Sequence, residues 1–160
     1  MNIALVAHDA RKSELLEWVE YNMDELLNHN LYATGTTGRL IQKIKEHTIS
    51  NDDGISCTIV RPFEENVTPL LSGPLGGDQQ IGAMIAEGKI DVLIFFCDNL
   101  ITQGHQQDVG ALVRLASLYN IPFATNRTTA DMIMTSPLLN DETYKRIIPE
   151  CINNYQNRIL

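Results

Sequence analysis

The sequence lacks any apolar run close to the roughly 20 residues that would cross a bilayer. Its 12 lysines and arginines form no basic cluster, and 20 aspartates and glutamates bring the formal net charge to -8 at pH 7. Nucleic-acid binding requires a basic surface, so neither nucleic acid nor a membrane is an expected partner. The apolar start, Met1 to Ala7, has no basic leader and Asp9 soon follows it, which predicts the first strand of a cytoplasmic protein rather than a signal peptide.

Paired cysteines are missing as well. Cys57, Cys97 and Cys151 are odd in number and widely spaced, with no Cys-x-x-Cys motif, so we expect buried reduced thiols rather than a zinc site or a disulfide framework. None of the 4 histidines stands at a metal-ligand spacing. The sequence therefore predicts no metal and no other cofactor, and the chemistry has to come from side chains and backbone.

Short apolar runs alternate with stretches of helical period along the 160 residues, a length that suits one domain, 1–160, with one core. This alternation predicts an α/β fold: an open, mainly parallel, doubly wound sheet with helices on both faces. The run Val92 to Phe96 has no polar alternation, which predicts a strand covered on both faces in the middle of the sheet. The expected strands are 3–7, 31–33, 67–71, 91–96 and 122–125.

Two segments stand apart from this pattern. Between His47 and Asn66, a turn signal at Ser50 to Gly54 precedes a β-rich stretch, which predicts a hairpin or an extra strand at the edge of the domain. From Pro149 to Leu160, apolar residues at helical spacing predict a short closing helix.

Polar loops follow four of the predicted strands. They are His8-Asp9, Thr34 to Gly38, Ser72 to Asp78 and Asp98 to Asp108. In open parallel sheets, ligands bind along the edge formed by the carboxyl ends of the strands. We therefore expect these four loops to converge on one crevice.

The loop Thr34-Gly35-Thr36-Thr37-Gly38 precedes the helical segment 39–44. Hydroxyls and backbone N–H groups at a helix N-terminus bind phosphate well. The alternative is that Thr36 or Thr37 merely caps the helix, but the loop holds more hydroxyls than a cap needs. The motif is not a P-loop, because the spacing and the following lysine are missing. Lys12 is expected to add a cation to the same site.

The stretch Ser72 to Asp78 places glycines, a serine and then a carboxylate where a helix should begin. Glycines let the backbone approach a small anionic ligand, and Ser72 supplies a donor. Asp78 is either a helix cap only or, as we favour, a base that removes a proton from carbon next to a carbonyl.

Two histidines have acidic neighbours. His105 and Asp108 lie one turn apart in a loop that leads into a helix over 109–118, and His8-Asp9 forms a second pair. Each is either a surface pair or a neutral imidazole that polarises a substrate oxygen and is oriented by a carboxylate. His29 and His47 have no such neighbours and are predicted to be solvated.

Taken together, these blocks resemble the methylglyoxal synthase family over nearly the whole chain. The matching blocks are Val6-Ala7-His8-Asp9, Ala33 to Gly38, Ser72 to Gln79, Phe95-Phe96 with Asp98, His105 and Asp108, and Ile121 to Asn126. The resemblance implies conversion of dihydroxyacetone phosphate into methylglyoxal and inorganic phosphate through an enediolate, a glycolytic bypass, without metal or organic cofactor. It also implies a homohexamer inhibited allosterically by phosphate.

The resemblance also implies roles for individual residues. Asp78 matches the catalytic base, and Asp9, Asp98 and Asp108 match supporting acidic positions, with His105 counted among both the catalytic and the substrate-binding residues. Arg158 matches a C-terminal arginine near a subunit boundary. The remaining substrate-binding matches are His8, Lys12, Thr34, Gly35, Thr36, Thr37, Ser72 and Gly73.

The chain departs from the family pattern in two places. Residues 47–66 resemble an insertion, and Asn99, Gly104 and Gln106-Gln107 replace the usual residues around His105. Two other functions remain open: a non-catalytic regulatory module of the same fold that binds a phosphate ligand, and a related sugar-phosphate lyase or isomerase. A regulatory module would have no reason to keep Asp78, His105 and Asp108 together, so the enzyme is favoured.

Overall fold

A computed structural model describes residues 1–50, 56–100 and 106–158. Its main sheet has five strands, and each neighbouring pair is parallel. The predicted parallel sheet is thus confirmed, but β1 rather than β6 is the middle strand. In spatial order the strands are β5 (Val67–Pro69), β2 (Asn30–Ala33), β1 (Asn2–Ala7), β6 (Val92–Phe96) and β7 (Phe123–Ala124).

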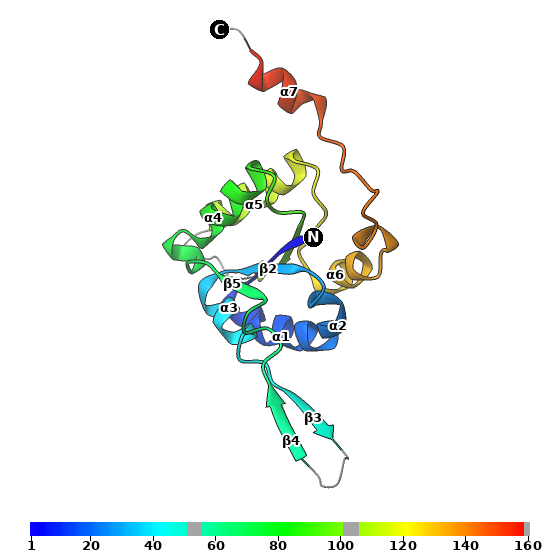
Figure 1. Cartoon of the computed structure of the whole chain (residues 1–160). Coiled ribbons are helices and arrows are strands. Elements are labelled where there is room, and N and C mark those ends of the chain that lie inside the picture. Colours follow the sequence, from blue (N-terminus) through cyan, green and yellow to red (C-terminus); the bar gives the residue numbers. More distant parts are fainter. Residues whose placement is uncertain (51–55, 101–105, 159–160) are drawn as a thin grey trace.

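Helices cover both faces of the sheet, as predicted (Figure 1). Odd-numbered residues of β1, such as Leu5, face one layer, which is formed by α1 (Lys12–Tyr21), α2 (Met23–Leu26), α3 (Gly35–Ile41) and α6 (Arg127–Met134). Even-numbered residues, such as Val6, face the other layer, formed by α4 (Gly77–Ala86) and α5 (Gln106–Leu118). All five residues of β6 are buried, as the unbroken apolar run predicts for a strand covered on both faces.

The first layer contains the only tryptophan of the chain. Trp18 is fully buried, and its indole N–H donates to Asp131 Oδ1 at 2.7 Å. Its ring meets that of Phe96 edge to face, with 5.9 Å between centroids. Since Trp18 lies on α1 and Asp131 on α6, this residue links both helices to the sheet.

A two-stranded antiparallel ribbon projects from the body (Figure 1). It consists of β3 (Glu46–Ser50) and β4 (Ser56–Val60), with Thr48 opposite Thr58. The prediction of a hairpin between residues 47 and 66 is confirmed, and its predicted turn lies partly outside the described residues. The segment lies between α3 and β5, so the hairpin leaves the main sheet unbroken.

The C-terminal segment leads away from the sheet (Figure 1). After the short helix η3 (Pro137–Leu139), an extended stretch reaches α7 (Glu150–Gln156). A helix was predicted here, but it does not close over the body: Tyr155 is 72% exposed, whereas Ile152 is buried. The helical spacing predicted this helix correctly, but the rest of the protein covers only the side that carries Ile152.

Two predictions of burial are wrong. His29 is buried rather than solvated, because it lies between the N-terminal amine, 3.2 Å from Nδ1, and Glu25 Oε1, 3.3 Å from Nε2. Cys151 is exposed on α7, whereas Cys97 is buried as expected, and burial raises the pKa of its thiol to about 11. The side chains of Cys57 and His47 lie outside the described part of the chain.

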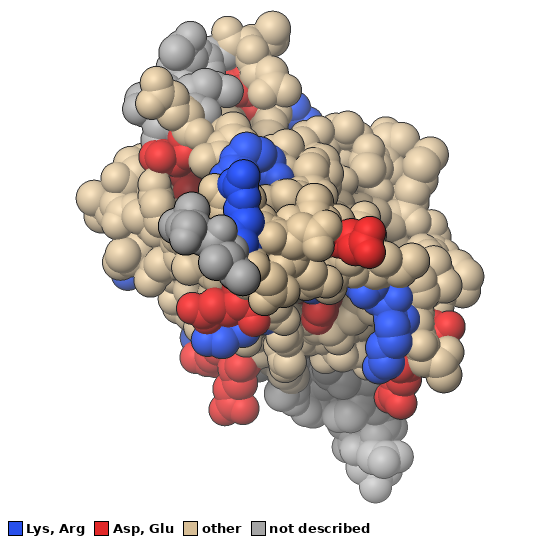
Figure 2. Space-filling view, turned by 90° about the horizontal axis from the view of Figure 1, so that it is seen from above, with Lys and Arg blue, Asp and Glu red and all other residues tan. Residues whose placement is uncertain are grey.

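The described surface carries mixed charge. Figure 2 shows Lys and Arg side chains interspersed with Asp and Glu, without a continuous basic area on the described part of that face. Among the helices of residues 1–50, 56–100 and 106–158, none is both long and apolar enough to cross a membrane.

Candidate active site

A cavity of about 570 Å³ opens at the carboxyl ends of the central strands. All four predicted loops contribute to it within the described residues, the fourth through Asp108, which belongs to the first turn of α5. The expected convergence is therefore confirmed for these segments. The cavity is lined by Val6, Ala7, His8, Asp9, Lys12, Thr34, Thr36, Thr37, Ser72, Gly73, Pro74, Asp78, Phe95 and Asp108.

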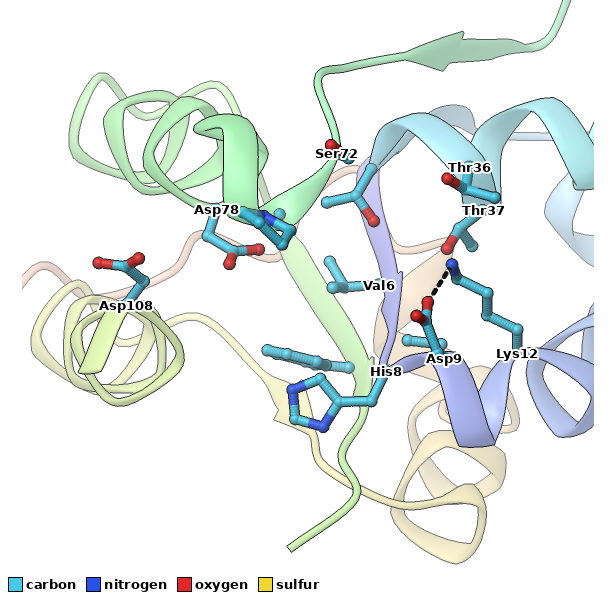
Figure 3. A pocket seen from close by; sticks show the side chains of 14 residues that line it. Val6, His8, Asp9, Lys12, Thr36, Thr37, Ser72, Asp78 and Asp108 are labelled. Atoms are coloured by element: carbon cyan, nitrogen blue, oxygen red, sulfur yellow. Dashed lines mark hydrogen bonds and ion pairs between the residues drawn. The ribbon is translucent and has the colours of Figure 1, made fainter. Parts of the chain in front are cut away.

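The threonine loop forms the first turn of α3. The helix begins at Gly35, earlier than predicted, and Thr34 is its N-cap without a side-chain capping hydrogen bond. Thr37 is 1% exposed, and its Oγ1 has no hydrogen-bond partner within the described structure. The alternative that Thr36 or Thr37 merely caps this helix is wrong, and the hydroxyls face a cavity instead (Figure 3).

The serine loop lies against the threonine loop. The N–H of Gly35 donates to the carbonyl oxygen of Leu71 at 2.9 Å, which fixes the distance between the two segments. Gly35 itself is buried behind the lining threonines, so its contribution is this backbone bond. Ser72 then begins the short helix η2 (Gly73–Leu75), and the carbonyl of Ser72 accepts the N–H of Gly77 at 3.0 Å.

A tight turn delivers Asp78 to the cavity. Gly76 has φ of 104°, a left-handed conformation that favours glycine, and it is the N-cap of α4. Asp78 is the second residue of the helix, so the alternative that it is only an N-cap is wrong. Its side chain is 3% exposed and lines the cavity.

A second carboxylate lies beside the first. Asp108 sits in the first turn of α5, because that helix begins at Gln106 and not at Val109 as predicted. Figure 3 shows Asp78 and Asp108 on one side of the cavity and Lys12, Thr36 and Thr37 on the other. The cavity thus has an acidic wall opposite a wall of hydroxyls and one ammonium group.

His8 lies at the end of β1 with 4% of its surface exposed. The backbone N–H of Asp98 donates to His8 Nδ1 at 2.8 Å. Since an N–H donor needs an acceptor, Nδ1 is unprotonated, and the proton of the neutral ring is assigned to Nε2. The ring also meets that of Phe95 edge to face, at 5.1 Å between centroids, so one side of the imidazole is packed against β6.

Lys12 and Asp9 form an ion pair across one turn, with Nζ 2.5 Å from Oδ1. The Asp9 side chain is 93% exposed, so this carboxylate holds the lysine from the solvent side. The carboxylate of Asp98 accepts the N–H of Leu100 at 3.0 Å and does not line the cavity. Asp98 therefore contributes to the site through its backbone N–H, which contacts His8, and not through its carboxylate.

Three predicted site residues do not line the cavity: Gly35 and Asp98, which contribute backbone hydrogen bonds, and Arg158. His105 lies outside the described residues, as does Gly104. Arg158 follows α7, where its guanidinium stacks over the ring of Tyr155 at 5.1 Å. Four lining residues were not predicted as site residues: Val6, Ala7, Pro74 and Phe95. All four stand inside sequence blocks that were singled out for their neighbours.

No group of three His, Cys, Asp or Glu side chains is arranged to hold a metal ion within 1–50, 56–100 and 106–158. The polar atoms that face the cavity are hydroxyl, ammonium, imidazole and carboxylate groups. This set suits a small anion with hydroxyl or carbonyl groups attached.

The fold and the cavity define a parallel α/β protein with an anion site at the carboxyl edge of its sheet. The model of the MGS-like domain family matches residues 14–125. A methylglyoxal synthase of Proteus mirabilis is 53% identical over 146 residues, covering 91% of this chain and 84% of the relative. One of Maridesulfovibrio salexigens is 51% identical over 147 residues, covering 91% and 89%.

A solved structure agrees with these relatives. The crystal structure of methylglyoxal synthase from Elizabethkingia anophelis superposes with a TM-score of 0.77 at 42% identity, covering 99% of this chain and 91% of that one. The chain belongs to the methylglyoxal synthase family.

Proposed function

We propose that this protein is a carbon–oxygen lyase that converts dihydroxyacetone phosphate into methylglyoxal and inorganic phosphate. Relatives named methylglyoxal synthase, about half identical over most of the chain, support this reaction. The observation that carries the proposal is the pairing in one cavity of a buried carboxylate, Asp78, with a wall of hydroxyls and Lys12. Such a cavity offers both a base and an anion site to a phosphorylated ketone.

The phosphate group is assigned to the hydroxyl wall. Thr34, Thr36, Thr37 and Ser72 offer donors there, Gly73 allows close approach of the backbone, and Lys12 supplies positive charge. The unpartnered Oγ1 of Thr37 supports this assignment, because a buried hydroxyl without a hydrogen bond is unfavourable until a ligand oxygen accepts from it. Gly35 takes part through its bond to Leu71.

Asp78 is the proposed base. It removes a proton from the hydroxymethyl carbon of the substrate, and the electron pair of the C–H bond forms the double bond of an enediolate. Its burial at the start of α4 supports this role, because water is kept from the carboxylate and its position is set by the turn. The negative charge of the intermediate then rests on the oxygen that was the ketone oxygen.

His8 is proposed to donate from Nε2 to that oxygen. The Asp98 N–H on Nδ1 supports the required tautomer, since a neutral ring with its proton on Nε2 is a donor toward the cavity. His105 is proposed to act on the second substrate oxygen, with Asp108 as the carboxylate that orients it. Asp9 is proposed to hold Lys12 in place through their ion pair.

Phosphate then leaves by elimination. The hydroxyl oxygen of the enediolate gives its proton to the departing phosphate and becomes the aldehyde oxygen, the double bond moves by one carbon, and the carbon–oxygen bond to phosphate breaks with its electron pair on phosphate. The enolate that remains takes up a proton at its terminal carbon, which replaces the one that Asp78 removed, and becomes methylglyoxal. Atoms balance, because the substrate gives one dicarbonyl and one inorganic phosphate without added water.

The test is to incubate the protein with dihydroxyacetone phosphate and measure dicarbonyl and phosphate together. Equal amounts of both support the lyase. Glyceraldehyde phosphate without free phosphate would instead indicate an isomerase, and an unchanged substrate would indicate a binding module.

The wider organisation is also proposed from the resemblance. Residues 1–160 form one methylglyoxal synthase-like domain with an insertion over 47–66, which contains β4 and most of β3. Inorganic phosphate acts as product and inhibitor in the cytoplasm. We further propose a homo-oligomer, a hexamer, with Arg158 near a subunit boundary; exposed apolar side chains of the C-terminal segment, such as Ile147 at 76% and Tyr155 at 72%, support such a contact.

A further inference from the structure

Arg11 makes two hydrogen bonds just behind the cavity. It is the last residue of the short helix η1 (Asp9–Arg11), and its Nε donates to Glu14 Oε2 at 2.6 Å. Its Nη1 donates to the carbonyl oxygen of Cys97 at 3.2 Å, beyond the end of β6. Arg11 does not line the cavity, so any effect on the reaction has to pass through these partners.

The Cys97 carbonyl belongs to the same peptide unit as the Asp98 N–H. A peptide unit is planar and trans, so its C=O and N–H point in opposite directions. On one side the carbonyl accepts from Arg11, and on the other the N–H donates to His8 Nδ1 at 2.8 Å. Glu14, Arg11, this peptide and the imidazole of His8 therefore form one hydrogen-bonded chain that ends in the cavity.

Backbone hydrogen bonds hold the chain that leads into this peptide unit, but they do not fix the plane of the unit itself. Cys97 N–H donates to Thr125 O at 3.3 Å, and His8 N–H donates to Phe96 O at 3.2 Å. Both bonds lie before the Cys97–Asp98 peptide, whose carbonyl is past the last residue of β6. The guanidinium thus fixes the rotation of a peptide that the sheet itself does not hold.

Hydrogen bonds in a chain polarise one another. A cation on a carbonyl oxygen draws electron density from the peptide and makes its N–H a better donor, and the effect is larger away from bulk water. The side chains of Arg11 and Glu14 are only 32% and 31% exposed. A better donor on Nδ1 keeps a proton off that nitrogen and makes the N–H at Nε2 more acidic.

We propose that Arg11 is a positioning residue of the reaction: through the Cys97–Asp98 peptide it fixes the orientation and tautomer of His8 so that Nε2 donates to the substrate. The role of His8 in this inference rests on the proposed function. The geometry rests only on three hydrogen bonds: Arg11 to Glu14, Arg11 to the Cys97 carbonyl, and the Asp98 N–H to His8. The hydrogen bond to Glu14 raises the pKa of Arg11, which keeps the guanidinium charged near neutral pH.

Other charged residues lie around the same cavity as His8. Asp9 and Lys12, from η1 and α1, line it together with Asp78 from α4 and Asp108 from α5. Asp98, after β6, reaches His8 through its backbone N–H. The tautomer and the protonation of His8 therefore have to be compared between proteins that keep these five charged residues. A substitution of Arg11 keeps all of them.

The experiment compares Arg11→Met with Arg127→Met. Arg127 pairs with Glu17 at 2.9 Å, and its side chain is 35% exposed, so it is a similar arginine–glutamate pair. Glu14 also acts on its charge, but the side-chain hydrogen bond of Arg127 in the described structure goes to Glu17 and not to the Cys97–Asp98 peptide. We expect Arg11→Met to lower kcat about tenfold to a hundredfold, as for a misplaced reacting group, with KM changed less than about twofold. Arg127→Met should leave both at the wild-type values, and Arg11→Lys should recover part of kcat because it keeps a cation near the carbonyl.

The ¹⁵N shifts of His8 in the ligand-free protein give a readout independent of activity. In the wild type we expect an unprotonated Nδ1 and a protonated Nε2, and in Arg11→Met a mixture of tautomers or protonation at higher pH. Unchanged shifts and unchanged kcat in a folded Arg11→Met protein, or equal losses in Arg127→Met, would overturn the inference. If the wild type forms no methylglyoxal, the proposed function is wrong, but the ¹⁵N shifts still show whether Arg11 sets the tautomer of His8. If Arg11→Met does not fold, the ¹⁵N shifts of Arg11→Lys answer the same question.

Discussion

Gly77 packs so tightly against the carbonyl of Leu71 that a Cβ on Gly77 would lie 2.9 Å from the carbonyl carbon and closer still to the oxygen. Leu71 O also accepts the N–H of Gly35, so this one carbonyl joins the threonine loop to the turn before Asp78. The distance between the proposed phosphate site and the proposed base is therefore set by backbone contacts. A side chain at position 77 would push the two apart.

We expect Gly77→Ala to destabilise the protein by about 1–3 kcal/mol, because the added methyl group forces a backbone shift. It should also lower kcat more than it raises KM, since Asp78 moves while the threonine loop stays. Chemical denaturation and steady-state kinetics measure the two effects. The matched control is Gly110→Ala in α5, where an added Cβ meets nothing within 4 Å. The control should gain about 0.5–1 kcal/mol of folding stability, because alanine has a higher helix propensity than glycine. Wild-type stability and kinetics in Gly77→Ala would contradict the account.

Thr37→Val removes the buried hydroxyl without changing the shape of the side chain. We expect the ligand-free variant to be as stable as the wild type or more so, because Oγ1 makes no hydrogen bond within the described structure. Binding of phosphate should weaken about tenfold, as expected when one hydrogen bond to a charged group is lost. Calorimetric titration with inorganic phosphate gives the affinity, and thermal unfolding gives the stability.

Thr135→Val serves as the control for that change. Thr135 donates from Oγ1 to Asp131 O at 2.9 Å, on α6 and outside the cavity. This variant should lose some stability and keep its phosphate affinity. If Thr37→Val instead keeps its affinity for phosphate, Thr37 is not part of the phosphate site.

His29 predicts a pH dependence of stability. Burial first, and then the charge of the N-terminus, lower the pKa of His29 below its ordinary 6.5 in the folded protein. The unfolded chain therefore takes up a proton at His29 before the folded one does, and the folded state loses stability as pH falls below about 6.5. His29→Gln should flatten this part of the curve, as measured by urea unfolding between pH 7.5 and pH 5. Parallel curves for both proteins would refute the assignment.

Much of the fold follows from local sequence patterns. The apolar runs of β1 and β6 and the helical spacing between strands predict the parallel sheet, and this sheet alone brings the loops after β1, β2 and β5 to one edge. The hairpin at β3 and β4 follows from a turn signal between β-rich segments. These features depend on neighbours in the sequence, which is why they can be predicted.

The errors concern contacts that depend on the folded chain and the exact ends of helices. His29 is buried because the chain end and Glu25 close over it, and no local pattern contains that information. The start of α5 at Gln106 makes Asp108 a helical residue, a boundary that propensity does not fix. No local pattern singles out Arg11; its contact with Cys97 spans 86 positions and requires the fold.

The central claim is that Asp78 starts the elimination. Asp78→Asn keeps the size and the polar character of the side chain and removes its ability to take a proton. We expect kcat for methylglyoxal formation to fall by about 10²–10⁴, the usual loss for a general base, while the affinity for inorganic phosphate stays within about twofold. The direct measurement is the rate of dicarbonyl and phosphate release from dihydroxyacetone phosphate by the wild type and by Asp78→Asn. Equimolar release by the wild type and near-total loss in the folded variant is the predicted result; release by Asp78→Asn at the wild-type rate would contradict it.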